Sequence, residues 1–365
     1  MRGDLHSGDT MTSTMTEPKP STRSGTTTGA ILVTGAGGEM GHALLKHLHG
    51  QWGGQREIVS IDLRELHGEA AAASTHSYCG SVADAEFVQA LASKHDIAEV
   101  WHLAALLSSS GERNPELALS VNVVGSCTLL KLAAEAARRR GQDVPFMFPS
   151  TIAAFGVESL AAKLAAGIVG EDECGEPITM YGLNKRAVEE MGRYYMRHYR
   201  LLDADRGSAR VDFRSIRFPG IFSADTVPMG GTSDYGPEML HAAAQGKAYS
   251  CFVRPDSRIS FMTMPDAVRA LTHLAQAPRS RLTRQVYNVT AFSPTAAEIE
   301  AKVREFFPRA EIAYAPVEAR QRIVDSWPLD LDDSAARRDW GWSPVHGFDE
   351  AFRDYLVPAV RARYG

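Results

Sequence analysis

The stretch "ILVTGAGGEMGHALL", residues 31–45, constrains the fold of this chain more than any other. A short apolar run ends in a glycine, and apolar residues at helical spacing follow. Gly35, Gly38 and Gly41 recur at every third position, with Gly37 as a further small residue. Such glycines permit a tight turn and let the backbone approach a pyrophosphate at a helix N-terminus. The stretch therefore predicts a strand–turn–helix unit that binds a dinucleotide.

Strand and helix patterns continue to alternate after this unit. Apolar runs typical of strands cover residues 57–64, 98–106, 144–150 and 213–221, and helical patterns cover 85–94, 115–140 and 181–200. Strands that alternate with helices of this length form a parallel sheet covered on both faces. We therefore predict an α/β fold with a doubly wound parallel sheet of the Rossmann type and a smaller C-terminal substrate-binding lobe.

Changes of composition suggest the domain limits. Residues 1–28 are rich in Thr, Ser, Gly and Pro, and we expect a disordered tail there. The predicted Rossmann domain covers 29–222, with segments of about 258–291 returning to it, and the predicted substrate-binding lobe covers 223–257 and 292–365. The polar, Gly-rich start of that lobe is expected to form a lid over the cleft.

The overall composition limits the possible partners. With 39 basic and 44 acidic residues the formal net charge is −5, which argues against nucleic acid or an anionic membrane as partner. No uninterrupted apolar run is long enough to span a bilayer. The four cysteines and twelve histidines show no metal-ligand spacing, so we expect no metal site. Free thiols and the absence of an apolar signal segment favour a cytoplasmic location.

Two further segments bear on cofactor choice. Asp62 ends the second strand, 21 residues after Gly41, where a carboxylate accepts hydrogen bonds from ribose hydroxyls and repels a 2′-phosphate. NAD is therefore the expected cofactor, although Arg64 nearby is a residue type that can favour a phosphate. Ala104 and Ala105 are small residues at the end of the predicted strand "AEVWHLAAL" (98–106) and leave room for the cofactor against the backbone.

A tyrosine and a lysine in "TMYGLNK" suggest proton transfer. Tyr181 and Lys185 stand at i and i+4 and share one helix face. Thr151 ends the fifth strand, at the sheet edge where open α/β folds bind ligands. A protonated Lys185 is expected to lower the pKa of Tyr181, which can then take a proton from an alcohol as hydride leaves. His102 is expected to be a structural histidine between sheet and helix.

Several motifs resemble one known family. "ILVTGAGGEMG" and "TMYGLNK" are similar to motifs of the extended short-chain dehydrogenase/reductase superfamily, the NAD-dependent epimerase/dehydratases. "LAALLSSSGE", "FPSTIAAFG", "RFPGIFSAD", "GGTSDY" and "SWPLDLDDSAARRDWGW" resemble, more narrowly, its short-chain L-threonine 3-dehydrogenases. The resemblance covers about residues 30 to 345.

The resemblance implies NAD-dependent oxidation of L-threonine at its β-carbon to L-2-amino-3-oxobutanoate, a step of threonine breakdown toward glycine or aminoacetone. It implies that Tyr181 is the general base, Lys185 its partner, and Thr151 the replacement for a catalytic serine. The implied substrate-binding residues are Ser108, Thr151, Tyr181, Thr232 and Trp327. The expected cofactor-binding residues are Gly35, Gly37, Gly38, Glu39, Met40, Gly41, Asp62, Leu63, Arg64, Leu103, Ala104, Ala105, Tyr181, Lys185 and Ile221.

The resemblance also implies a homodimer formed through a four-helix bundle of the helices at 115–140 and 181–200. The chain departs from the family pattern where "YCGSV" follows the third strand and where residues 158–177 are longer than usual and lack a Pro-Arg pair. Two alternatives stay open at this point. They are a nucleotide-sugar epimerase of the same superfamily and a non-enzymatic NAD(P)-binding regulator.

Overall fold

The protein is described by a computed structural model over residues 28–204, 207–228 and 230–365. The tail expected over residues 1–28 therefore lies, apart from its last residue, outside the described part. The strands of the central sheet are β1 (Ala30–Thr34), β2 (Ile58–Asp62), β3 (His76–Cys79), β4 (Ile97–His102), β5 (Val144–Thr151), β7 (Val211–Phe218) and β11 (Val286–Asn288). They are parallel and lie in the order β11-β7-β5-β4-β1-β2-β3. The predicted fold class is confirmed.

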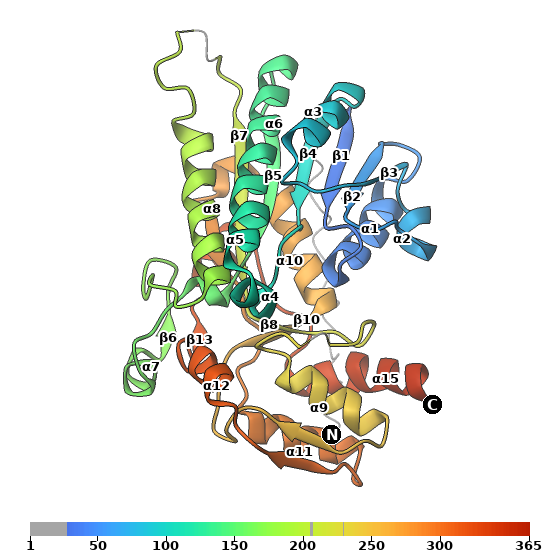
Figure 1. Ribbon diagram of the computed structural model, residues 1–365, viewed down its shortest axis with the longest axis vertical. Helices are drawn as coiled ribbons and strands as arrows, with labels where there is room; N and C mark the ends of the chain where they lie inside the picture. The colour runs from blue at the N-terminus through green and yellow to red at the C-terminus, as the bar shows by residue number, and fades with distance from the viewer. Residues whose placement is uncertain (1–27, 205–206, 229) are drawn as a thin grey trace, which may run out of the picture.

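Helices cover both faces of this sheet (Figure 1). One face is covered by α1 (Glu39–Trp52) and α10 (Met264–Gln276). The other face is covered by α3 (Ala85–Lys94), α6 (Gly125–Arg140) and α8 (Met180–Arg197). Every residue of β1 and of β7 is buried, as expected for strands with a helix layer on each side. Burial of the sheet explains why these strands are continuous apolar runs rather than alternating patterns.

The helix expected over residues 115–140 is present but is not uniform. It begins as α5 (Pro115–Ala118), passes through a π-helical turn at Leu119–Val124 and continues as α6. By length and composition this stretch is the one helix in the described ranges that could cross a membrane. In the structure it packs across β4 and β5 and against α3 and α8, which accounts for those of its apolar residues that are buried.

Three predicted strands end earlier than the sequence suggests, and the first of them is β2, which ends at Asp62. β4 ends at His102, and the chain then leaves the sheet to line a cleft. The run 213–221 breaks at Pro219, because proline has no N–H to donate to a ladder. The residues beyond it form β8 (Gly220–Phe222), which pairs in parallel with β10 (Phe261–Thr263) outside the main sheet.

A second layer lies below the sheet in Figure 1. Its helices and strands are α9 (Tyr235–Ala244), β9 (Tyr249–Cys251), α11 (Ala296–Phe306), β12 (Ile312–Tyr314), α12 (Glu318–Asp325) and α15 (Val357–Tyr364). They share an apolar cluster that includes Phe222, Tyr235 and Phe261. Between them, the chain returns to the main sheet through α10 and β11.

The long segment over residues 158–177 is folded against this second layer. It contains α7 (Leu160–Ala166) and β6 (Ile168–Val169), and β6 pairs with β13 (Asp330–Leu331). Lys163 is buried and donates from Nζ to the carbonyl oxygen of Val324 at 2.9 Å. The segment thus connects α8 to the end of α12.

Candidate active site

A cleft of about 600 Å³ opens at the carboxyl ends of the parallel strands, where doubly wound folds bind ligands. Its wall combines the glycine-rich turn, the segment after β4, the start of α8 and parts of the second layer. These contributions meet in one space, and every residue predicted for catalysis, cofactor binding or substrate binding lines it. Those residues are Gly35, Gly37, Gly38, Glu39, Met40, Gly41, Asp62, Leu63, Arg64, Leu103, Ala104, Ala105, Ser108, Thr151, Tyr181, Lys185, Ile221, Thr232 and Trp327.

The glycine-rich turn has the geometry of a pyrophosphate site. Gly35 has a φ of 70°, and a Cβ there would lie 2.6 Å from the backbone nitrogen of Ala104. A Cβ at Gly41 would lie 2.3 Å from the carbonyl oxygen of Gly35, so only glycine fits at either position. Gly38 is the N-cap residue of α1 and has no side chain to cap it, which leaves backbone N–H groups at the helix N-terminus for an anion. These residues fit a dinucleotide.

Asp62 is held at the edge of this turn. Its carboxylate accepts hydrogen bonds from the backbone N–H groups of Gly37 at 2.8 Å and Arg64 at 3.2 Å. The carboxylate therefore has a fixed position in the cleft wall, as a ribose acceptor requires. Further along the wall, Gly80 and Ser81 offer backbone and hydroxyl contacts only. The ring of Phe87 lies so close to Gly80 that a Cβ there would clash with it.

Tyr181 and Lys185 begin α8 and point toward the end of β5. Lys185 donates from Nζ to the carbonyl oxygen of Pro149 at 2.6 Å. The same nitrogen lies 4.4 Å from the ring centroid of Phe148 and 5.6 Å from that of Tyr181. Thr151 ends β5, and its hydroxyl hydrogen-bonds the Tyr181 phenol. The structure thus brings the three predicted catalytic residues together.

The expected lowering of the Tyr181 pKa by Lys185 is not found in the protein alone. Burial raises the pKa of Tyr181 above its ordinary value, and only the hydrogen bond from Thr151 opposes this. Burial also lowers the pKa of Lys185 to about 7, against the opposing charge of Glu189. The physical reason is that both groups are almost free of water, and desolvation disfavours the charged form of each.

A buried charge network lies beneath these residues, and the sequence interpretation missed it. Glu189 stands one turn after Lys185 and accepts from Arg217 Nη2 at 2.6 Å and Nε at 2.9 Å. Both side chains are fully buried. Ser150 donates to the same carboxylate at 2.5 Å. The i,i+4 spacing of Lys185 and Glu189 was the available signal, whereas nothing local points to Arg217.

The cleft wall after β4 is fixed by a second residue that the sequence interpretation missed. Asn122, in the π-helical turn, donates to the backbone carbonyl of Leu106 at 3.0 Å and accepts from its N–H at 2.7 Å.

His102 is buried between Thr34 at 2.7 Å and Ser126 at 2.8 Å. Burial, with the nearby charge of Lys185, lowers the pKa of His102 to about 3. Its predicted structural role is confirmed by these contacts.

The described part of the loop between β8 and α9 lies against the cleft. Thr232 Oγ1 is 3.2 Å from Ser108 Oγ, and both residues are buried. Ser109 donates to the carbonyl of Gly230 at 2.8 Å, and Arg320 donates to that of Gly231 at 2.6 Å. Two of the predicted substrate-binding hydroxyls are therefore adjacent.

The same loop contacts the glycine-rich turn. Thr226 donates from Oγ1 to the carboxylate of Glu39. Glu39 is still exposed to solvent, but partial burial and the carboxylates of Asp234 and Asp225 raise its pKa above the ordinary value. This contact joins the first helix turn to the loop at the mouth of the cleft.

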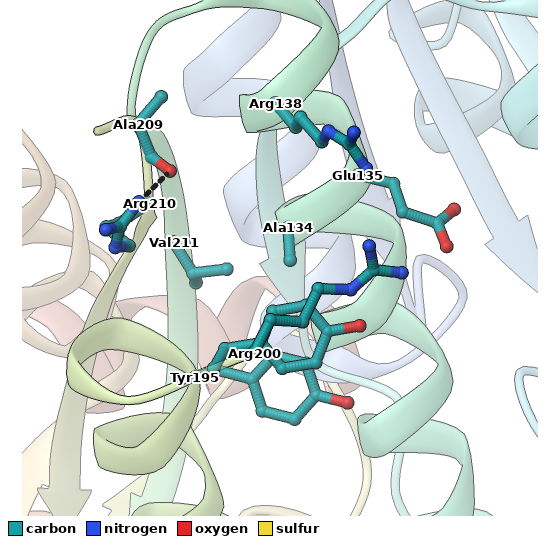
Figure 2. Close-up of a pocket in the computed structure, with 9 residues that line it drawn as sticks. Ala134, Glu135, Arg138, Tyr195, Arg200, Ala209, Arg210 and Val211 are labelled. Carbon is teal, nitrogen blue, oxygen red and sulfur yellow. Dashed lines mark hydrogen bonds between the residues drawn. The ribbon is translucent and has the colours of Figure 1, made fainter. Parts of the chain in front are cut away.

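A second hollow lies between α6 and α8, near their C-terminal ends (Figure 2). Its volume is about 40 Å³, which is too small for a metabolite. Tyr195 and Tyr199 stack there with ring centroids 4.4 Å apart, and Arg200 lies over Tyr199. None of the predicted site residues lines this hollow. The cleft at the sheet edge is therefore the candidate active site.

The fold and this cleft place the chain in the class of doubly wound enzymes that use a nicotinamide dinucleotide. Residues 31–290 match the family described as the NAD dependent epimerase/dehydratase family. The mitochondrial L-threonine 3-dehydrogenase of Bos taurus is 35% identical over 320 residues, which cover 87% of this chain and 79% of that protein.

Solved structures to which this chain is similar include L-threonine dehydrogenases as well. An L-threonine dehydrogenase from Clostridium difficile matches with a TM-score of 0.80 and 32% identity, covering 92% of this chain and 99% of that one. A monomeric L-threonine 3-dehydrogenase from a metagenome, in its apo form, matches with a TM-score of 0.79 and 31% identity, covering 92% and 100%. The chain belongs to the NAD dependent epimerase/dehydratase family, and it is an enzyme of that family. The predicted resemblance is confirmed.

Proposed function

We propose that this enzyme uses NAD to oxidise L-threonine at its β-carbon to L-2-amino-3-oxobutanoate, with Tyr181 as the general base. The observation that carries the proposal is the convergence of two sets of side chains in one cleft. Thr151, Tyr181 and Lys185 form one set, and the buried Ser108–Thr232 pair forms the other. The similarity to enzymes named L-threonine 3-dehydrogenase supports the choice of substrate.

The residues that line the cleft indicate how the cofactor would be held. The turn from Gly35 to Gly41 would hold the pyrophosphate, and Asp62 would accept hydrogen bonds from the adenosine ribose. Asp62 also disfavours a 2′-phosphate, which supports NAD over NADP. When bound, NAD supplies the hydride acceptor and a positive charge.

Tyr181 would take the proton of the substrate hydroxyl at its phenolic oxygen. The carbon–oxygen bond becomes a carbonyl as the hydrogen on that carbon leaves as hydride, so the alcohol gives a hydride (one proton and two electrons) to NAD and a second proton to Tyr181. Thr151 hydrogen-bonds the phenol and opposes the effect of burial on its pKa. Lys185 is held by Pro149 within reach of the same site and would steady the phenolate when protonated.

Ser108 and Thr232 would bind the polar groups of the amino acid. A small zwitterion has little apolar surface, so its binding depends on a few hydrogen bonds to charged groups in a site closed to water. The two hydroxyls are buried and 3.2 Å apart, close enough to share one ligand group. Trp327, also buried, lines the same cleft and would help to exclude water.

The test is NADH formation with a panel of 3-hydroxy amino acids and nucleotide sugars. We expect turnover with L-threonine and none with UDP-sugars. Turnover of a nucleotide sugar without turnover of threonine would identify an epimerase-type enzyme instead. Binding of NAD without turnover of any alcohol would contradict the proposed reaction altogether.

We further propose that the enzyme forms a homodimer through α6 and α8, which lie side by side in Figure 1. Large apolar side chains are exposed along this surface. They are Leu117, Leu119, Val124, Leu183 and Tyr194. Analytical ultracentrifugation should give a dimer that Leu183→Glu converts to a monomer. A monomeric wild type would contradict the proposal, as it would match the metagenomic relative named monomeric.

We also propose that the enzyme acts in the cytoplasm, on the grounds of its free thiols. Cell fractionation tests this. Recovery of the enzyme from an organelle or a secreted fraction would contradict it.

A further inference from the structure

Three side chains far from the cleft form a compact group with metal-binding chemistry. Glu57 precedes β2, His76 begins β3, and His95 follows α3, so all three lie at the amino ends of the strands. The cleft lies at the opposite, carboxyl ends. We propose that Glu57, His76 and His95 form a binding site for a transition-metal dication of the zinc class.

The distances between the donor atoms suit such an ion. Glu57 Oε1 lies 2.8 Å from His95 Nδ1 and 3.1 Å from His76 Nε2. One donor atom from each residue lies within 4.8 Å of the others. Tetrahedral zinc with bonds of about 2.0–2.2 Å places its ligands roughly 3.3 Å apart. Each contact to Glu57 therefore needs to open by only a few tenths of an ångström.

The kinds of donor select the class of ion. Two imidazoles and one carboxylate are borderline nitrogen and oxygen ligands, which suit Zn²⁺ and its neighbours better than Mg²⁺ or Ca²⁺. Three protein ligands leave a fourth position for water. Because the side chain of His76 is 48% exposed, solvent and ions can reach that position.

The local charge also favours a cation. Among the residues that the structure describes, Glu57 pairs with no Lys or Arg, only with the two imidazoles. The neighbouring Arg56 is engaged by Glu99 at 2.7 Å. The half-buried carboxylate thus has no Lys or Arg as counter-charge, and a bound dication would supply one.

A further contact orients the buried ligand. The hydroxyl of Tyr78 lies 2.8 Å from Nε2 of His95, on the far side of that ring from Glu57. When Nδ1 binds a metal, the ring proton resides on Nε2 and donates to this hydroxyl. Partners of this kind fix the tautomer and orientation of a metal-binding histidine. Tyr78 is therefore a positioning residue for the site.

The site would join three elements at the edge of the sheet. β3 is the last strand of the sheet, it has only four residues, and none of them is fully buried. A metal held by Glu57, His76 and His95 would tie this strand to the residues flanking β2 and β4. Binding to the folded state alone stabilises that state by mass action.

The test uses the full-length, tag-free protein after removal of metal with a chelator. Zn²⁺ is titrated against a chromophoric chelator, and thermal unfolding is followed with and without Zn²⁺. We expect one tightly bound Zn²⁺ per chain and a rise in Tm. His76→Ala and Glu57→Gln should each weaken binding at least tenfold and abolish the rise. Tyr78→Phe should weaken binding by roughly 10–100-fold, as for other partners of ligating histidines.

His67→Ala is the matched control, because His67 is an exposed histidine that lies outside the group. It should bind Zn²⁺ like the wild type. Stoichiometric binding that survives in the double variant His76→Ala, Glu57→Gln would place the metal elsewhere and overturn the proposal. Equal, weak binding by wild type and double variant would overturn it too, and would leave the three residues as a hydrogen-bond network only.

Discussion

The side-chain oxygens of Ser108 and Thr232 lie 3.2 Å apart, although 124 residues separate them in the chain. Ser108 begins α4 (Ser108–Arg113), just after the wall segment that follows β4. Thr232 belongs to the loop before α9, in the second layer. Their contact therefore spans the two sides of the cleft, and it depends on the position of that loop.

Removal of either hydroxyl should weaken threonine binding without affecting NAD. Thr232→Ala and Ser108→Ala should each raise KM for threonine roughly tenfold or more, because a hydrogen bond to a charged group contributes roughly 1.5–3 kcal/mol. Steady-state kinetics and NAD titration measure the two effects. If the loop closes over the substrate, hydrogen exchange across residues 223–235 should slow when NAD and threonine bind together. Normal threonine kinetics in both variants would exclude these residues from the site.

Tyr181→Phe should abolish oxidation while NAD still binds. The phenol supplies proton transfer and the ring only packing, so turnover should fall by roughly 10²–10⁴-fold. Tyr195→Phe is the matched control, since Tyr195 lies on the same helix but lines the small hollow and not the cleft. Near-normal turnover of the Tyr181 variant would show that another group is the base.

Asp62→Ala should erode the preference for NAD over NADP. The substitution removes a hydrogen-bond acceptor that is fixed by Gly37 and a charge that repels a 2′-phosphate. The ratio of kcat/KM for the two cofactors should fall at least about tenfold, given the magnitude of a charge-assisted hydrogen bond. Glu65→Ala, an exposed neighbour, should leave the ratio unchanged. A wild type that prefers NADP would contradict the assignment.

Lys185→Met should inactivate the enzyme yet stabilise the fold near neutral pH. Burial lowers the pKa of Lys185 from 10.5 in the unfolded chain to about 7 in the folded one. The unfolded state therefore binds more protons between these values, and wild-type stability gains from this group as pH rises from 7 toward 10.5. Urea unfolding should show the advantage of the variant at pH 7 shrinking by pH 9.5. A constant difference across that range would contradict the assigned shift.

Arg217→Met should destabilise the fold by roughly 3–5 kcal/mol, because it leaves the carboxylate of Glu189 buried without its partner. The double variant Arg217→Met, Glu189→Leu should recover much of the loss, since the buried ion pair is then removed as a whole. Urea unfolding of both variants measures this. A single variant as stable as wild type would mean that the pair contributes nothing to the fold.

The glycine-rich turn, the alternating strands and helices and the Tyr181–Lys185 spacing could be predicted from the sequence, because each is a local pattern. A strand ending in glycines, or two residues one helical turn apart, has the same geometry wherever it occurs. The position of Asp62 could be predicted from the same strand–turn–helix unit, because in this fold the end of the second strand lies beside the glycine-rich turn. These local features were sufficient for the fold class and the family.

Only the tertiary structure decided how these groups interact with the rest of the protein. The net shift of the Tyr181 pKa was predicted with the wrong sign, because a pKa depends on the water removed by all surrounding elements and not on one neighbour. The same holds for Arg217 beneath Glu189, and for Glu57, His76 and His95, which come from three different elements. Residues that are distant in sequence meet only when the chain packs, so neither periodicity nor spacing can reveal their contact.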